Sequence, residues 1–158
     1  MVNTREELRA LKLLRSNELT RDMETKQLRM LATIAREVEF EVDEVIYRQG
    51  DRGRGLYLII SGEVVIETKT PEHGYVILNR LEPGQFFGWS SLFPYEYKMA
   101  WTRASKPTRV FAFDAARIKE AEQSDQVLAY ALARCAGKAM IERIKWTRKQ
   151  LADQLAAA

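Results

Sequence analysis

The feature that most constrains the fold is a series of short strand-like runs in the middle of the chain, separated by turn signals. In the first run, Val38, Phe40 and Val42 alternate with acidic residues, which is the two-residue period of a half-buried strand. Many short runs rich in β-branched and aromatic residues, with Gly or Pro in most of the breaks, predict an antiparallel roll or barrel. The runs lie at 38–42, 45–47, 56–60, 64–68, 75–78, 101–104 and 109–113.

Helical periodicity flanks these strands on both sides. Leucines recur at helical spacing within residues 5–36, on either side of a polar break at residues 16–17, and a short helix at 115–121 precedes a long one at about 126–155. The order predicts a mainly β fold with flanking helices. We expect an antiparallel double-stranded β-helix (a jelly-roll-like β-roll) with N-terminal helices and a long C-terminal helix. The expected divisions are an N-terminal helical segment at 1–36, the roll at 37–114 and the C-terminal helices at 115–158.

Composition places this chain among ordinary globular proteins. Its 158 residues are enough for one domain with its own core, and the net charge of +3 neither demands nor excludes nucleic acid. No apolar stretch approaches the ~20 residues that cross a bilayer, and the polar N-terminus does not resemble a signal peptide. The one cysteine, Cys135, cannot form an internal disulfide. A cytoplasmic location without membrane contact is expected.

The long C-terminal helix carries a heptad-like stripe that favours a homodimer. About 30 helical residues would span about 45 Å, longer than a roll of this size can cover, so part of the helix is free to meet a partner helix. A basic cluster around Trp146 is more typical of a solvated face than of a nucleic-acid contact, and no helix-turn-helix follows, so direct DNA binding by this chain is not expected. The expected dimer contacts include Gly137, Ile141, Ile144, Arg148 and Leu151.

Several segments, in order and spacing, resemble the cyclic nucleotide-binding domain family, the sensor modules of catabolite-activator (Crp/Fnr) type regulators, cyclic-nucleotide-dependent kinases and gated channels. Residues 45–51 and 56–64 resemble the family's two glycine-marked hairpins. Residues 81–88 resemble the run into its phosphate-binding cassette, and residues 99–104 resemble the strand that leaves it. The resemblance implies a regulatory sensor, with cAMP or cGMP as ligand and a signal that passes to the long helix.

The cassette keeps the backbone half of a phosphate site. The turn at Gly88 can open a short helix whose free amides and two serine hydroxyls form an anion site, although a helix capped by its own serines needs no ligand. The resemblance implies a glutamate directly after that glycine, to accept from the ribose hydroxyl, and an arginine near the cassette's end, to pair with the cyclic phosphate. Here Trp89 occupies the glutamate position, and Lys98 (or Tyr97, if the loop aligns differently) occupies the arginine position.

These replacements weaken the case for a cyclic nucleotide. Trp89 cannot accept a hydrogen bond and is expected to fill the space of the ribose, while Lys98 lacks the fork of an arginine. Their loss removes about 2–5 kcal/mol of binding. The candidate ligand-binding residues are Gly88, Trp89, Ser90, Ser91, Lys98 and Met99.

Three interpretations of this pocket remain open from sequence. It binds another small anion or a weakly held nucleotide, or it is closed and the chain is a ligand-free dimerisation or docking module, or it holds an apolar ligand. The apolar ligand would lie against aromatic residues that are more often core. They are Trp89, Tyr95, Tyr97 and Trp101.

Catalysis is not expected. The chain has a single histidine, His73, in a predicted hairpin turn, so neither a cupin-type metal site nor a nucleophile–base pair can be assembled. The chain is therefore interpreted as a stand-alone regulatory sensor domain with no metal, a small-molecule ligand and a downstream protein partner that the sequence does not identify. The alternative is the sensor half of a Crp/Fnr-type transcription regulator that lacks its DNA-binding domain.

Overall fold

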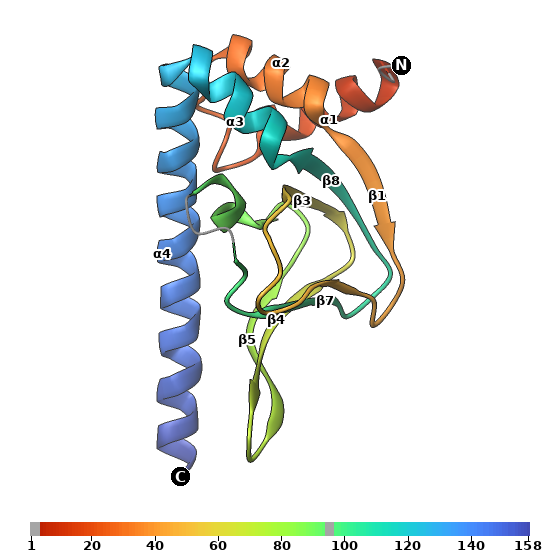
Figure 1. Ribbon diagram of the computed structural model, residues 1–158. Helices are drawn as coiled ribbons and strands as arrows, with labels where there is room; N and C mark the ends of the chain where they lie inside the picture. Colours follow the sequence, from red (N-terminus) through yellow and green to blue (C-terminus); the bar gives the residue numbers. More distant parts are fainter. Residues whose placement is uncertain (1–3, 94–96) are drawn as a thin grey trace.

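The computed structural model describes residues 4–93 and 97–158 and shows a β-roll with helices at one end and along one side (Figure 1). The helices are α1 (Thr4–Ser16), α2 (Thr25–Ile34), the 3-10 helix η1 (Trp89–Leu92), α3 (Ala115–Ser124) and α4 (Gln126–Ala157). The strands are β1 (Arg36–Phe40), β2 (Val45–Tyr47), β3 (Gly55–Ser61), β4 (Val64–Thr70), β5 (Gly74–Leu81), β6 (Phe86–Phe87), β7 (Trp101–Ala104) and β8 (Thr108–Asp114).

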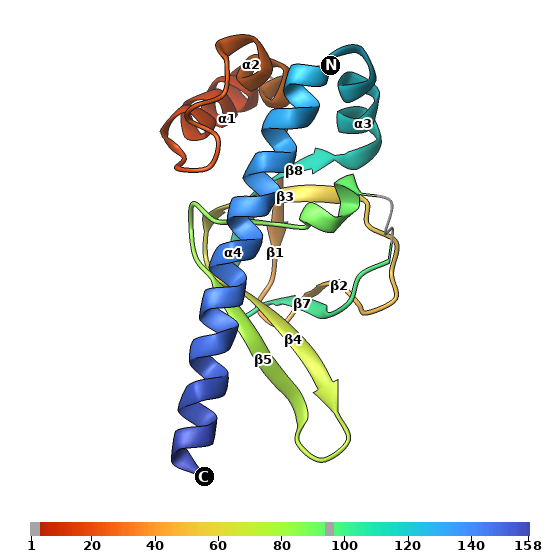
Figure 2. The ribbon, with the colours of Figure 1, turned by 90° about the vertical axis from the view of Figure 1, so that its left-hand side faces the viewer.

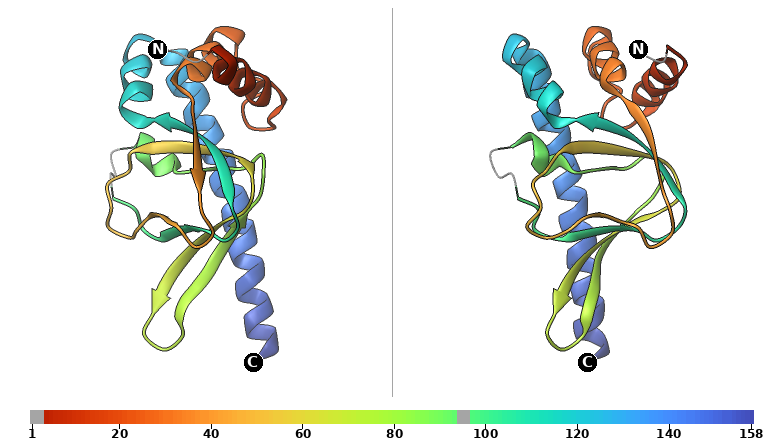
Figure 3. Two further views of the ribbon diagram at one scale, coloured as in Figure 1. Left: turned by 90° about the vertical axis from the view of Figure 1, so that its right-hand side faces the viewer. Right: turned by 45° about the vertical axis from the view of Figure 1, so that its right-hand side comes forward.

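The strands form two four-stranded antiparallel sheets that face each other across the roll (Figure 3). One sheet has the order β1-β8-β3-β6 and the other has the order β2-β7-β4-β5. Chain neighbours often fall in different sheets, so the connections wind between the two layers. This arrangement confirms the mainly β roll with flanking helices that the sequence predicts.

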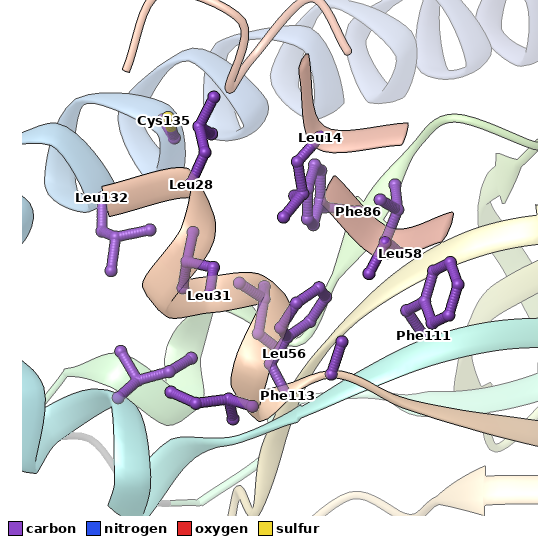
Figure 4. Close-up of a cluster of buried hydrophobic side chains, with 14 of the residues drawn as sticks. Leu14, Leu28, Leu31, Leu56, Leu58, Phe86, Phe111, Phe113, Leu132 and Cys135 are labelled. Atoms are coloured by element: carbon purple, nitrogen blue, oxygen red, sulfur yellow. The ribbon is translucent and has the colours of Figure 1, made fainter. Parts of the chain in front are cut away.

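The larger core lies between the first sheet and the helices (Figure 4). Leu14 of α1, Leu31 of α2 and Leu132 of α4 pack toward the outer faces of β3 and β8. The sheet contributes Leu56, Leu58, Phe111 and Phe113, each almost fully buried. Each such side chain contributes about 1.5–3 kcal/mol to folding, so the helices and the roll are one folding unit.

A second, smaller core fills the interior of the roll. It is built from inward-facing residues of both sheets, which alternate with outward-facing ones as the strand period requires. Its fully buried members are Ile59, Val64, Leu81, Phe87 and Val110. The polar cavity described below opens beside this core.

Helix α4 starts beside α3 and runs past the roll alongside the β4–β5 hairpin (Figures 1 and 2). The Asp125 carboxylate accepts from the Leu128 amide at 3.0 Å and caps its first turn. Farther along, the Asn79 amide of β5 donates to Thr147 at 3.4 Å. The Cys135 thiol donates to the Leu19 carbonyl at 2.9 Å, and burial raises the pKa of this thiol. Of the helices in residues 4–93 and 97–158, none combines the length and hydropathy of a membrane span.

The first strand departs from the expected bounds. It begins at Arg36 and ends at Phe40, and Val42 lies outside it with a mostly exposed side chain. The reason is a turn at Asp43, where φ is 67° and the Glu44 amide bonds the Glu41 carbonyl at 3.1 Å. The alternation of apolar and acidic residues therefore continues past the residue at which the strand ends. The two-residue strand β6 was not expected, because it is too short to show a period.

Candidate ligand-binding site in the roll

The turn from β6 into η1 shapes the backbone of the site. Gly88 has φ of 91°, a left-handed conformation that favours glycine, and a Cβ there would lie 2.5 Å from the Gly55 carbonyl oxygen. The Ser91 amide bonds the Gly88 carbonyl at 3.0 Å, and the Ser91 hydroxyl donates to the Gly55 carbonyl at 3.0 Å. Gly88 is thus required by a close approach of β3, and η1 is fixed against that strand.

Lys98 points into this turn. Its ammonium donates to the Ser90 hydroxyl at 3.0 Å and to the Ser91 hydroxyl at 2.9 Å, and lies 4.5 Å from the centre of the Tyr47 ring. The backbone is held too, because the Lys98 amide bonds the Asp51 carbonyl at 2.7 Å. The side chain is only 5% exposed. The structure therefore brings together Ser90, Ser91 and Lys98 of the predicted site.

The Lys98 ammonium is buried without a carboxylate partner among the described residues. Burial, with a smaller contribution from the positive charge of Arg143, lowers the pKa of Lys98 to about 8. Burial also raises the pKa of the Tyr47 and Tyr57 hydroxyls, so both stay neutral and able to donate. At neutral pH the site presents a desolvated cation and two phenols.

A cavity of about 340 Å³ opens beside Lys98. Its walls carry the cations of Arg52, Arg54 and Lys98, against one carboxylate at Asp51. Tyr57 stacks on Phe87 with ring centres 4.8 Å apart, which fixes the orientation of its ring. The other lining residues are Ile46 and Tyr47. Among the described lining residues, Arg54 and Lys98 alone outnumber the one carboxylate, and this positive balance suits an anionic ligand.

Helix α4 contributes Arg143 to the surroundings of this cavity. Its guanidinium donates to the Phe86 carbonyl at 2.9 Å and is near enough to Lys98 to disfavour its protonated form. Burial lowers the pKa of Arg143, and the nearby Tyr47 opposes this shift. No carboxylate in residues 4–93 and 97–158 pairs with Arg143. Two desolvated cations from distant parts of the chain thus face the same region.

Trp89 does not lie where the sequence interpretation put it. It is 1% exposed and packs on Phe86, with ring centres 5.3 Å apart, within the core under the helices. Its side chain does not line the cavity, so it does not fill the space expected for a ribose. Its buried indole nitrogen has no hydrogen-bond partner among residues 4–93 and 97–158. What remains true is that no carboxylate occupies this position.

Of the predicted ligand residues, Lys98 alone is among the described residues that line the cavity, and Gly88, Ser90 and Ser91 lie behind it in the turn. Met99 is 85% exposed and does not line it. Of the aromatic residues proposed for an apolar ligand, Tyr97 is exposed, and Trp101 packs against Tyr75 with ring centres 5.5 Å apart. Tyr95 lies outside the described residues. The described lining residues are four charged side chains and two tyrosines, with Ile46 the one aliphatic side chain, and this polarity disfavours the apolar ligand.

Some contributors were missed by the sequence interpretation. Arg52 and Arg54 lie in the connection from β2 to β3, where basic residues are usually solvated and carry no pattern. For Arg143 a signal was present, because it follows the buried Cys135 and Ala139 at intervals of four on the same face of α4. Extending that stripe by one turn would have placed Arg143 toward the roll.

The predicted dimer residues share the opposite face of α4. Gly137 and Arg148 are exposed, and Ile141, Ile144 and Leu151 are each more than half exposed. Tyr130 and Leu155 extend the same apolar stripe. Histidine, cysteine and carboxylate side chains do not gather in threes anywhere in the described part of the chain, so it offers no cluster for a metal ion.

Comparison with known proteins gives a consistent picture. Residues 37–125 match the sequence profile of the cyclic nucleotide-binding domain. The cAMP-activated global transcriptional regulator Vfr of Pseudomonas aeruginosa is 28% identical over 139 residues, which cover 85% of this chain and 63% of Vfr. The chain thus spans less than two thirds of the length of that relative.

Solved structures share the fold. A Geobacter metallireducens protein described as cyclic nucleotide-binding has a TM-score of 0.77 at 27% identity, covering 85% of this chain and 98% of its own. The sensor domain of the transcriptional regulator DNR from Pseudomonas aeruginosa has a TM-score of 0.70 at 25% identity, covering 88% and 93%. A cyclic nucleotide-binding domain from Methylobacillus flagellatus reaches 0.79 at 18% identity, covering 95% and 84%.

Proposed function

The chain belongs to the cyclic nucleotide-binding domain family, and we propose that it works as a regulatory sensor whose roll cavity binds a small anionic molecule. The family is the one that the sequence resemblance indicates, and its members here are regulatory proteins. What this chain binds must be argued from its own residues.

The observation that carries the proposal is the buried Lys98 ammonium. A desolvated charge without a counter-charge destabilises a fold, so it is retained where a ligand supplies the opposite charge. The Ser90 hydroxyl, which accepts from Lys98, can turn its own proton toward an anion, whereas the Ser91 hydroxyl donates to the Gly55 carbonyl. Arg143 faces the same region from α4, so a bound anion would attract both cations and draw the helix toward the cassette.

A cyclic nucleotide is the ligand class that the family suggests, yet this site lacks one of its usual partners. The position that would accept from a ribose hydroxyl holds Trp89, whose ring is committed to the core. We therefore expect cAMP and cGMP to bind weakly, and anions recognised by charge alone to compete with them.

Calorimetric titration tests this proposal. The probes are cAMP, cGMP and inorganic pyrophosphate, and the proteins are the unaltered chain, Lys98→Gln and the control Lys12→Gln on the exposed face of α1. At least one probe should bind, and Lys98→Gln should weaken it at least about tenfold, the value of a charge-assisted hydrogen bond. Absence of binding by all three at millimolar concentration, or equal binding by Lys98→Gln, would contradict the anion site. Micromolar binding of cAMP would contradict only the expected weakness.

Homodimerisation through α4 is the second part of the proposal. The exposed apolar stripe that includes Ile141, Ile144 and Leu151 lies opposite the face that packs on the roll. Gly137 leaves open space above the backbone for close approach of a second helix. Such a dimer would pass a change at Arg143 from one roll to the other. We also propose a cytoplasmic location, in keeping with the single unpaired cysteine.

A second candidate function is the sensor part of a transcription regulator. It is favoured by the similarity to Vfr, which extends over 85% of this chain. In that case ligand binding should alter α4. Amide hydrogen exchange in residues 140–157, with and without the tightest-binding probe, would show protection that depends on Lys98. Unchanged exchange under saturating probe would count against it.

A further inference from the structure

A larger cavity of about 680 Å³ lies outside the roll, between the α1–α2 connection, the turn from β5 to β6, and α4. The described residues that line it are all different from those that line the roll cavity. We propose that this cavity, called here the α4 groove, binds a small amphipathic organic anion of the aromatic carboxylate type. This site is additional to the proposed sensor function, and either can fail without the other.

The floor of the α4 groove is apolar. Leu13 and Leu19 come from the N-terminal segment, Pro83 from the turn before β6, and Trp146 from α4. Trp146 is half-buried and lines the cavity, so part of its indole is accessible to a ligand. Cavities of about 300–1,000 Å³ with apolar walls are typical small-molecule sites.

Cations gather on the α4 side of the groove. Arg80, Lys145 and Lys149 line it with Arg143, whereas its carboxylates are Glu18 and Glu142. Arg80 of β5 is paired with Glu63 at 3.1 Å and Lys145 with Glu142 at 3.2 Å. Lys149 has no carboxylate partner among the described residues. After these ion pairs are counted, the groove lining still carries more positive than negative charge. An occupant with one negative group over an apolar body matches both features.

The walls are held in place without a ligand. The Asn17 side chain donates to the Gly84 carbonyl at 2.6 Å and accepts from the Leu19 amide at 2.9 Å, which joins the α1–α2 connection to the turn before β6. On the other side, Arg143 ties α4 to the Phe86 carbonyl at 2.9 Å. A preformed site loses less conformational entropy on binding, so the groove is suited to a small molecule.

Nuclear magnetic resonance of the tryptophan indole N–H groups reads this site directly, because the chain has three tryptophans in different places. The probe is indole-3-acetate, and its uncharged counterpart is 3-methylindole. Indole-3-acetate should move the Trp146 signal saturably and leave in place the signals of Trp89 in the core and of Trp101 in β7, neither of which lines the groove. The Trp146→Phe variant, which lacks that signal, identifies it.

Charge substitutions then distinguish binding that involves the carboxylate of the probe from nonspecific apolar association. Lys149→Gln and Arg80→Gln should each weaken indole-3-acetate about three- to fivefold, the range for a partly exposed charge contact. Lys138→Gln, at an exposed residue of α4 that does not line the groove, should have no effect. The proposal is overturned if Trp146 does not respond at millimolar probe, if 3-methylindole binds as tightly, or if Lys149→Gln behaves like Lys138→Gln.

Discussion

Replacing Lys98 with methionine should make the protein more stable at neutral pH. Burial lowers the pKa of this ammonium from its ordinary 10.5 to about 8. At about 1.4 kcal/mol for each pH unit, holding the charged form in the folded state costs about 3 kcal/mol. Methionine fills a similar volume without charge. It loses two hydrogen bonds to serine hydroxyls, about 1 kcal/mol each, so the variant should be more stable by about 1 kcal/mol near pH 7.

The sign of the pH dependence follows from the direction of the shift. Between pH 8 and 10.5 the unfolded chain keeps the Lys98 proton while the folded chain has released it. The unfolded state then binds more protons, so the stability of the unaltered protein rises with pH in this window. Lys98→Met has no such contribution. The stability of the unaltered protein relative to the variant should therefore increase by about 2 kcal/mol from pH 7.5 to 9.5.

Urea unfolding followed by circular dichroism measures this difference. Both proteins are unfolded at pH 7.5 and at pH 9.5, so that titration of all other groups cancels in the comparison. Lys12→Met, on an exposed part of α1, should show the same pH dependence as the unaltered protein. The reasoning is refuted if Lys98→Met is less stable at pH 7.5, or if its difference from the unaltered protein is the same at both pH values.

The remaining predictions concern the cassette, the core and the dimer. Gly88→Ala should lower the free energy of unfolding by about 3 kcal/mol in urea titrations, because φ of 91° and the nearby Gly55 carbonyl both oppose a Cβ. A loss below 1 kcal/mol would show that the backbone of β3 can shift to make room for the Cβ, against this reasoning. Trp89→Glu should lower the free energy of unfolding still more, by about 4 kcal/mol or more, because it places a carboxylate in the core beside Phe86. A soluble variant of unchanged stability would show that the core does not require the Trp89 side chain. Ile144→Glu should shift the sedimentation coefficient from that of a dimer to that of a monomer at tens of micromolar, whereas Lys138→Glu should not. If the unaltered chain is itself a monomer at this concentration, the proposed dimer through α4 is wrong. Affinity for an anionic probe should fall as pH rises above 8, as Lys98 loses its proton, and constant affinity from pH 7 to 9.5 would argue against a contact with the ammonium.

Much of the fold was predictable because its signals are local. Strand periods, glycine-marked turns and helical spacing each act within a few residues, and their order along the chain specified a roll between helices. The resemblance of residues 81–88 and 99–104 to a phosphate-binding cassette also placed Ser90, Ser91 and Lys98 together. The errors at Val42 and β6 arise where a backbone turn or a very short strand leaves no periodic trace.

The site was less predictable because it is assembled from distant segments. Trp89 follows a left-handed glycine, so its side-chain direction depends on a φ angle that residue type alone does not reveal, and the helices above it provide the apolar surface it occupies. Arg143 reaches Phe86 across 57 positions in the chain. Arg52 and Arg54 converge on the cavity through the path of a loop. Each of these depends on tertiary geometry rather than on neighbouring sequence.

The buried Cys135 has a practical consequence for experiments on α4. It is the one thiol in the sequence, its sulfur donates to the Leu19 carbonyl, and its raised pKa keeps it in the unreactive thiol form. A cysteine introduced at an exposed position such as Lys138 would therefore react first with a maleimide or a nitroxide reagent, in an otherwise unaltered protein. Spin labels at that position would give the separation of the two copies of α4 in a dimer, and its change when an anion enters the roll.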